Sequence, residues 1–173
     1  IKFDLSGYPA EEFPKLAEAS SDAARLAEEE GLLKEMLSQT EVAIARDETR
    51  PILTGLLLET EANKLKLVAT DGHRLAFRQA AYADNTELKA VIPGKAIREV
   101  SKILEDAQDK KVEICLDDTC VVFIMDGIVL SSRLVEGKYP PYQQIIPTDF
   151  KTSVVADAQA LQAALERAEI IVR

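Results

Sequence analysis

The stretch ILTGLLLETEANKLKLVATDGHRLAFRQAAY, residues 52–82, contains three runs with the character of β-strands. Turn signals separate the runs, one around Asn63 and one around Gly72. Apolar runs of this length, bounded by Gly, Asn or Asp, are typical of strands joined by hairpins. We therefore predict a three-stranded meander whose runs are 52–60, 64–70 and 74–82.

A helix is predicted on either side of this meander. Before it, apolar residues at 30–46 fall on one helical face, and Pro51 stops the pattern because the residue before proline disfavours the helical region. Composition rich in Ala, Leu and Glu makes 23–29 helical as well. After the meander, a short strand at 88–92 precedes a second helical pattern at 95–104.

Three further β-like runs follow the second helix. Asp-Asp and Asp-Gly turn signals lie between them. The runs are 112–116, 120–125 and 128–134. The order is thus a helix with three strands, a short strand, and again a helix with three strands. This order predicts an α+β fold made of two helix-plus-antiparallel-sheet repeats.

The ends of the chain lie outside this repeat. Residues 1–5 alternate as a strand does, 136–149 form a proline-containing loop, and a strand at 152–156 leads into a helix from Asp157. Gly-Tyr-Pro near the start recurs as Lys-Tyr-Pro at 138–140, which predicts a tandem array of similar domains. We expect both ends to be cuts through a longer protein.

Composition excludes several classes of protein. The chain has 173 residues, enough to bury a core, and its longest apolar run is too short to cross a membrane. With 30 acidic and 21 basic residues the net charge is −9, so the chain as a whole repels nucleic acid and anionic lipid. Any contact with DNA must come from a local basic stripe.

Neither a cofactor nor a metal is predicted. Cys115 and Cys120 have no ligand spacing, and no glycine-rich phosphate loop occurs. The two thiols would face each other if Asp117-Asp118 formed a hairpin turn. Without a signal peptide we expect them to be reduced and the protein to be cytoplasmic.

His73 is the single histidine, so a catalytic triad would have to use it with Asp71. The pair lies in a turn between two β-runs, where a structural or surface role is the commoner one. A hydrolase based on these two residues is kept as an alternative, and no catalytic residue is predicted.

The second helix has a basic face. At 100° per residue, Lys95, Arg98 and Lys102 lie together, the apolar residues lie on the other side, and Glu99 and Glu105 fall off the centre of the stripe. An ordinary solvated face is one interpretation. In a chain of net charge −9, however, three bases in register suit sequence-independent contact with phosphates.

Apolar residues also occur at turn and loop-edge positions. These positions are Leu53, Thr70, residues 72–75 and the stretch 140–145. An exposed apolar patch there would bind a partner. The alternative is that these side chains belong to the core. A generic α/β interaction module without DNA binding would carry the same features.

Four motifs occur in a fixed order along the chain: DETRPILTG at 47–55, VATDGHRLA at 68–76, VIPGK at 91–95, and LVEGKYP at 134–140 with a closing Ile146-Pro147. In this order they resemble the bacterial β sliding clamp family, the processivity subunits of replicative DNA polymerase III. The resemblance implies a non-catalytic protein of the DNA-clamp fold. Three similar domains form each protomer, and two protomers close a homodimeric ring around duplex DNA.

The resemblance also implies how the chain is divided. Residues 1–19 would end the first clamp domain, 22–148 would be the complete middle domain, and 149–173 would begin the third. It makes 23–28 a strand, against the composition. Because ring contacts in the family join the first and third domains, the chain by itself is expected to be a monomer.

Two sites follow from the resemblance. The DNA-facing residues would be Lys95, Arg98, Lys102, Arg46 and Arg50. Replicative and repair polymerases and the clamp loader would insert short linear peptides into an apolar pocket formed by Leu53, Thr70, Gly72, His73, Arg74, Leu75, Pro140, Gln144 and Ile145. Gln144 stands where the family often has Arg, and Pro141 where Asp is common, so the charge at the pocket rim differs here.

Overall fold

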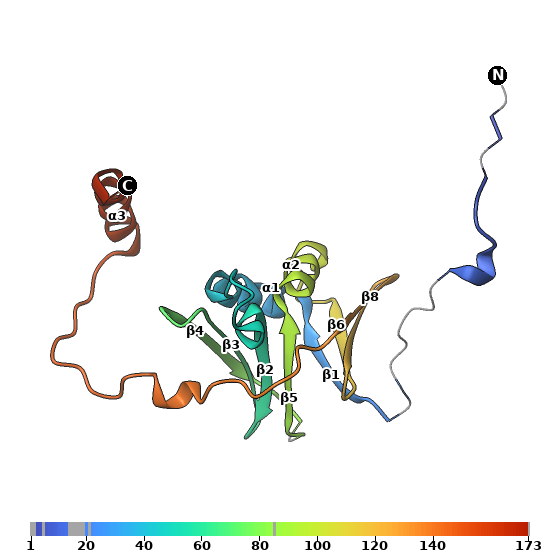
Figure 1. Ribbon diagram of the computed structural model, residues 1–173. Helices are drawn as coiled ribbons and strands as arrows, with labels where there is room; N and C mark the ends of the chain where they lie inside the picture. The colour runs from blue at the N-terminus through green and yellow to red at the C-terminus, as the bar shows by residue number, and fades with distance from the viewer. Residues whose placement is uncertain (1–2, 5, 14–19, 21, 85, 173) are drawn as a thin grey trace. The chain divides into compact units, whose positions relative to one another are not determined.

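The computed structural model describes residues 3–4, 6–13, 20, 22–84 and 86–172, and it divides the chain into two units, Ile1–Tyr139 and Pro140–Arg173. The first unit confirms the predicted repeat, with the short strand predicted before the second helix and the strand that the resemblance implied before the first (Figure 1). The first copy is β1 (Ala24–Glu29), α1 (Glu30–Thr40), β2 (Gly55–Glu61), β3 (Lys64–Thr70) and β4 (Leu75–Ala81). The second copy is β5 (Leu88–Pro93), α2 (Gly94–Ile103), β6 (Lys111–Leu116), β7 (Cys120–Met125) and β8 (Ile128–Arg133).

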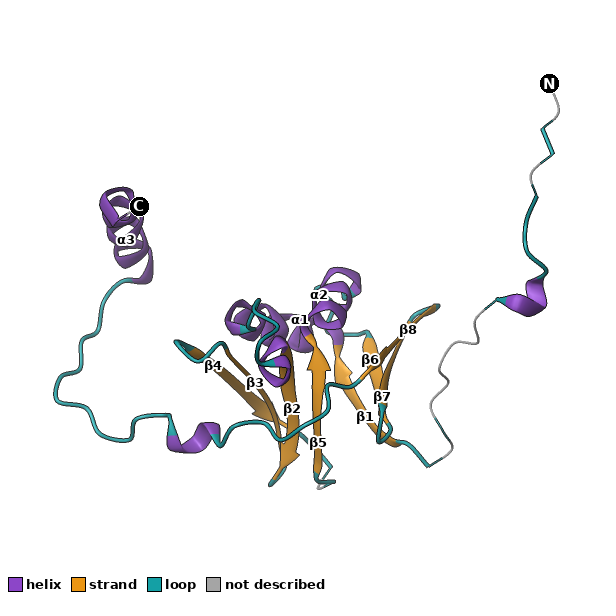
Figure 2. Cartoon of the chain, viewed as in Figure 1, coloured by secondary structure: helices purple, strands orange, loops and turns teal. Residues whose placement is uncertain are grey.

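The two copies exchange their first strands. One antiparallel sheet has the order β4-β3-β2-β5 and the other the order β1-β6-β7-β8. Strand β5 of the second copy thus completes the sheet of the first, and β1 completes the sheet of the second. Both helices lie on the same side of the two sheets and contact each other (Figure 2).

One hydrophobic core is shared by both copies. It includes Leu33 and Met36 from α1, Ile97 from α2, Leu58 from β2 and Phe123 from β7, all of them nearly inaccessible to solvent. Burial of apolar surface between these elements is the main term that favours the fold. Since each sheet also needs a strand from the other copy, neither copy has a complete core by itself.

The helix predicted from composition at 23–29 is wrong, and the strand implied by the resemblance is confirmed as β1. Leu26 lies opposite Ile114 of β6, and across the same pair of strands Arg25 and Glu113 form an ion pair of 2.7 Å. Buried and exposed side chains alternate along β1 after Arg25. Pairing with a distant strand outweighs the local preference for helix, which is worth only tenths of a kcal/mol per residue.

The first predicted helix is also too long, because α1 ends at Thr40 rather than at 46. The Thr40 hydroxyl donates to the carbonyl of Met36 at 2.8 Å, and a 3-10 turn follows at Glu41–Ala43. The β-branched Ile44 then leaves the helix in extended conformation and packs in the core. Strand β2 likewise begins three residues later than predicted, after the 3-10 turn Pro51–Thr54.

At the chain ends the strand predicted at 152–156 is wrong, whereas the helix predicted from Asp157 is confirmed. Residues 152–156 carry no regular structure, and no described strand pairs with them. Helix α3 (Ala158–Val172) follows, and Asp157 accepts a hydrogen bond from the amide of Ala160 at 2.8 Å. Residues 3–4 are irregular too, whereas 1–2 and 5 lie outside the described residues.

Both cysteines are free, as predicted, but they do not face each other. Cys115 lies opposite Val122 of β7, and Cys120 lies opposite Arg133 of β8. Leu116 lies opposite Val121, and the amide of Asp117 donates to the carbonyl of Cys120, so the turn lies one residue later in the chain than the facing arrangement requires. No helix among the described residues has the length and apolar character needed to cross a membrane.

Candidate functional site

Helix α2 presents the predicted basic face. Lys95, Arg98 and Lys102 are exposed, whereas Ile97 and Val100 on the other side are buried in the core. The helix begins at Gly94, where a Cβ atom would lie 2.8 Å from Ile44 and 2.9 Å from the carbonyl of Thr54. Glycine at this position therefore lets α2 pack closely on the segment before β2 and fixes the direction of its basic face.

Glu99, predicted to lie off the centre of the basic face, is bound to one of its cations. Its carboxylate accepts a hydrogen bond from Lys102 at 2.9 Å, in an i,i+3 ion pair. The hydrogen bond from Lys102, with the charges of Lys95 and Arg98, lowers the pKa of Glu99. The face thus carries three cations and one carboxylate, and Lys95 and Arg98 are its cations without an ion pair among the described residues.

Thr70 and Leu75 are paired where β3 ends and β4 begins, and residues 71–74 form the hairpin loop between them. The Thr70 hydroxyl donates to the carbonyl of Arg74 at 2.7 Å and accepts from the amide of Gly72 at 3.1 Å. Gly72 has φ +90°, a conformation that glycine adopts at little cost. Thr70 is therefore buried as the scaffold of the loop, while Gly72, His73 and Arg74 are exposed on it.

Asp71 holds the loop from inside. One of its carboxylate oxygens accepts from the amides of His73 and Arg74 at 2.9 and 3.0 Å, and the other from Nε of Arg74 at 3.2 Å. These bonds, led by the one from His73, lower the pKa of Asp71 from 3.8 to about 2. A lowered folded-state pKa stabilises the loop above pH 3.8, and this contribution is lost as the pH falls through about 2.

This geometry does not favour the hydrolase alternative. Asp71 binds the backbone amide of His73, so it does not orient the imidazole as a catalytic base requires. Among the described residues there is no group of three or more His, Cys, Asp or Glu able to hold a metal ion.

Arg50 contacts the loop and not the basic face of α2. Its Nη2 donates to the carbonyl of Asp71 at 2.9 Å. Leu53, three residues later, is buried, and its amide donates to the carbonyl of Arg50 at 3.0 Å. Two predicted pocket elements, Leu53 and the 71–74 loop, are thus linked through Arg50. Arg46 is exposed, and its predicted contact with DNA stays a prediction.

The remaining predicted pocket residues belong to the second unit, which is described by itself. Ile145 is 56% exposed and Gln144 is exposed, while Pro140 is partly buried. Gln144 closes a 3-10 turn (Tyr142–Gln144), in which its amide donates to the carbonyl of Pro141 at 3.1 Å. Their contribution to a peptide pocket stays a prediction.

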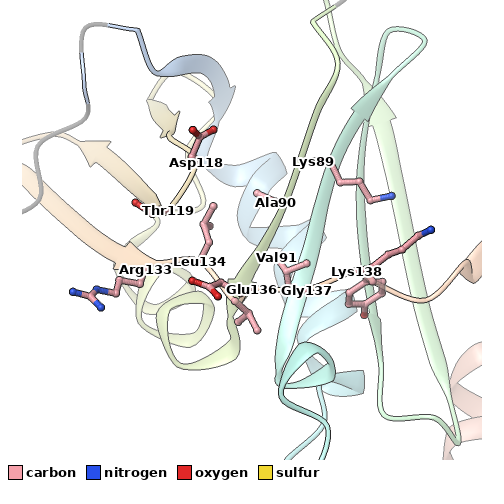
Figure 3. A pocket seen from close by; sticks show the side chains of 12 residues that line it. Lys89, Ala90, Val91, Asp118, Thr119, Arg133, Leu134, Glu136, Gly137 and Lys138 are labelled. Carbon is pink, nitrogen blue, oxygen red and sulfur yellow. The ribbon is translucent and has the colours of Figure 1, made fainter.

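A strap, residues 134–139, runs from the end of β8 to strands β5 and β3 of the β4-β3-β2-β5 sheet. The amide of Leu134 donates to Thr119 at 2.9 Å, and that of Val135 to Val91 at 2.8 Å. A groove of about 910 Å³ lies between the strap, β5 and the turn at 118–119 (Figure 3). Its walls carry both signs of charge, which favours neither anions nor cations. This groove is not evident from the sequence, because its walls come from distant segments.

Tyr139 lies in the LVEGKYP motif, and the sequence predicts no individual role for it. It is buried at the end of the strap, and its hydroxyl donates to the carbonyl of Val68 at 3.4 Å, two residues before Thr70. Burial raises the pKa of Tyr139 to about 12. Tyr139 thus fixes the strap beside the strand that carries the hairpin loop. An aromatic residue directly before a proline is the sequence feature that could have indicated this role.

Because ionised Tyr139 is disfavoured in the fold, we expect the protein to lose stability as the pH rises from about 10 through about 12. Tyr139→Phe removes this term, so at pH 11 the variant should lose about 1 kcal/mol less of its pH 8 stability than the wild type. Urea unfolding at both pH values measures the difference. Equal losses in the two proteins would contradict the burial of this hydroxyl.

Comparisons with known proteins agree with this geometry. A family model described as the central domain of the DNA polymerase III beta subunit matches residues 19–141. The beta sliding clamp of Bacillus subtilis strain 168 is 37% identical over 174 residues, which cover 99% of this chain and 46% of the relative. The crystal structure of the Bacillus subtilis clamp has a TM-score of 0.92 at 37% identity, with 99% of this chain and 45% of that chain covered.

A clamp from Pseudomonas aeruginosa, solved bound to griselimycin, has a TM-score of 0.87 at 31% identity, with 94% of this chain and 44% of that chain covered. The chain therefore spans less than half the length of these relatives.

Proposed function

Because the chain belongs to the family of DNA polymerase III beta subunits, the sliding clamps, we propose that it forms the middle part of a ring that encircles duplex DNA and confers processivity on a replicative polymerase. The observation that carries this proposal is the basic face of α2 on a protein of net charge −9. A few cations hold phosphates without reading bases, while the acidic remainder discourages nonspecific adsorption. No bond is made or broken in this role.

The ring can be tested by comparing circular with linear DNA. A full-length clamp that carries this chain, once loaded, should stay on closed circular DNA and be released when the circle is cut, because a ring slides off a free end. Gel filtration of the loaded complex before and after linearisation measures this. Equal retention on both forms, or on neither, would instead favour an interaction module without a DNA-encircling role.

We propose further that the hairpin loop at 71–74, with Leu53, binds extended peptide segments of polymerases and the clamp loader. The exposed Gly72 allows close approach of a peptide backbone, and the loop is held by its own hydrogen bonds before any partner arrives. A capped Ser-Leu-Ser-Leu-Ser-Leu peptide, whose leucines share one face when extended, is a suitable probe. We expect a Kd of about 10 μM to 1 mM, since few contacts offset the ordering of a flexible peptide.

Two glycines allow a matched comparison. Gly72 and Gly127 both lie in hairpin turns with positive φ, +90° and +71°, but only Gly72 is in the proposed site. Both substitutions strain a turn by about 1 kcal/mol, and Gly72→Ala also places a Cβ atom against Arg50. Gly72→Ala should weaken the peptide by about fivefold or more, and Gly127→Ala should leave its affinity unchanged. NMR titration measures both. Chemical shift changes confined to α2, with none at 70–75, would place the peptide on a different face.

A further inference from the structure

The Arg50 guanidinium lies against the back of the hairpin loop. Besides its 2.9 Å hydrogen bond to the carbonyl of Asp71, it occupies the space beside Gly72. A Cβ atom on Gly72 would lie 2.8 Å from Nη1 and 3.0 Å from Nη2 of Arg50. The loop and the guanidinium therefore fit together only while residue 72 has no side chain.

Arg50 is itself attached to the core. The 3-10 turn Pro51–Thr54 begins directly after it, and the amide of the buried Leu53 donates to its carbonyl at 3.0 Å. Leu53 in turn accepts a hydrogen bond from the amide of Ala45 at 3.0 Å. These backbone hydrogen bonds hold the backbone of Arg50 in place while its side chain contacts the loop.

The other hydrogen bonds of the loop are internal. They join Thr70 to Gly72 and Arg74, and Asp71 to His73 and Arg74. Among the described residues, the bond from Arg50 is the one that reaches loop 71–74 from outside the β3-β4 hairpin. Internal bonds set the shape of the loop, whereas a contact from another element sets where the loop lies relative to Leu53.

We propose that Arg50 is a positioning residue for the peptide site, which holds loop 71–74 against the segment that carries Leu53. This inference rests on the proposed peptide-binding role of the loop. The contact of Arg50 with DNA is separate from this role and stays a prediction.

Two peptides separate positioning from direct contact. One is capped Ser-Leu-Ser-Leu-Ser-Leu, and the other has two of its serines replaced by glutamate. Arg50→Ala should weaken both by the same factor, about three- to tenfold, as expected for loss of a charge-assisted hydrogen bond. Arg46→Ala, which removes an exposed arginine four residues away, should change neither. A loss restricted to the acidic peptide would mean that Arg50 pairs with peptide carboxylates, and would overturn the positioning role.

A double-variant cycle gives a readout that general destabilisation does not produce. Because the clash expected in Gly72→Ala is with the guanidinium, Arg50→Ala should relieve part of it, so the two losses of affinity should be less than additive. Amide shifts of Gly72 and His73 in the free protein should move in Arg50→Ala without a change in the melting temperature. Strict additivity with unmoved amide shifts would overturn the contact.

Failure of the two proposals can be told apart. If the wild type binds neither peptide at millimolar concentration, the peptide-binding role of the loop is wrong, and the role of Arg50 falls with it. If the wild type binds and Arg50→Ala binds equally well, only the positioning role is wrong.

Discussion

Replacing Lys95, Arg98 and Lys102 together by alanine is expected to flatten the salt dependence of DNA holding by a full-length clamp that carries this chain. The slope of log K against log salt should fall by roughly 2 to 3 units, because each phosphate contact contributes about 0.9. The lower figure applies if Lys102 stays paired with Glu99 when DNA is bound. The loss of DNA affinity should be the same on any DNA sequence, since these side chains are expected to contact phosphates and not base edges.

The matched control removes three exposed cations that lie outside α2, by Lys64→Ala, Arg133→Ala and Lys138→Ala. The net charge changes equally, so an equal effect on the slope would mean that overall charge matters and not the basic face. Glu99→Gln should act in the opposite direction, because it frees Lys102 and removes a negative charge from the face. A triple variant with an unchanged slope would show that the face is only solvated.

Phe123→Ala is expected to lower the free energy of unfolding by about 3 to 5 kcal/mol, as removal of a large buried side chain usually does. Phe123 lies on β7 opposite Ile114 and Leu130, in the core shared by both sheets and both helices. Since the copies exchange their first strands, the loss should appear in one cooperative transition of the whole first unit. Urea unfolding followed by circular dichroism and by tyrosine fluorescence should give coincident curves.

Phe77→Ala is the control for Phe123→Ala. Phe77 lies on β4 and is 38% exposed, so its truncation should cost about 1 kcal/mol. If the two probes showed separate transitions in Phe123→Ala, with the β4-β3-β2-β5 sheet still folded, the idea of a single shared core would be wrong.

Several features of the fold and site follow from short-range pattern. Strands β3, β6 and β7 and helix α2 lie within about a residue of their predicted bounds, because apolar period and turn residues are local properties. The basic face of α2 follows from the 100° spacing of Lys95, Arg98 and Lys102, and their exposure agrees. The pairing of Glu99 with Lys102 was also within reach, since residues three apart on a helix are neighbours.

Local sequence determined that this protein has two helix-plus-sheet repeats, an acidic charge and one basic helix face, since each depends on residues close in the chain. Tertiary structure alone decided that 24–29 is a strand, because its partner β6 lies more than eighty residues away in the chain and pairing with it outweighs helix preference. It also decided the exchange of first strands and the hydrogen bond from Arg50 to the carbonyl of Asp71, across 21 positions. Such contacts depend on which surfaces pack together, and that is a property of the whole core and not of any one segment.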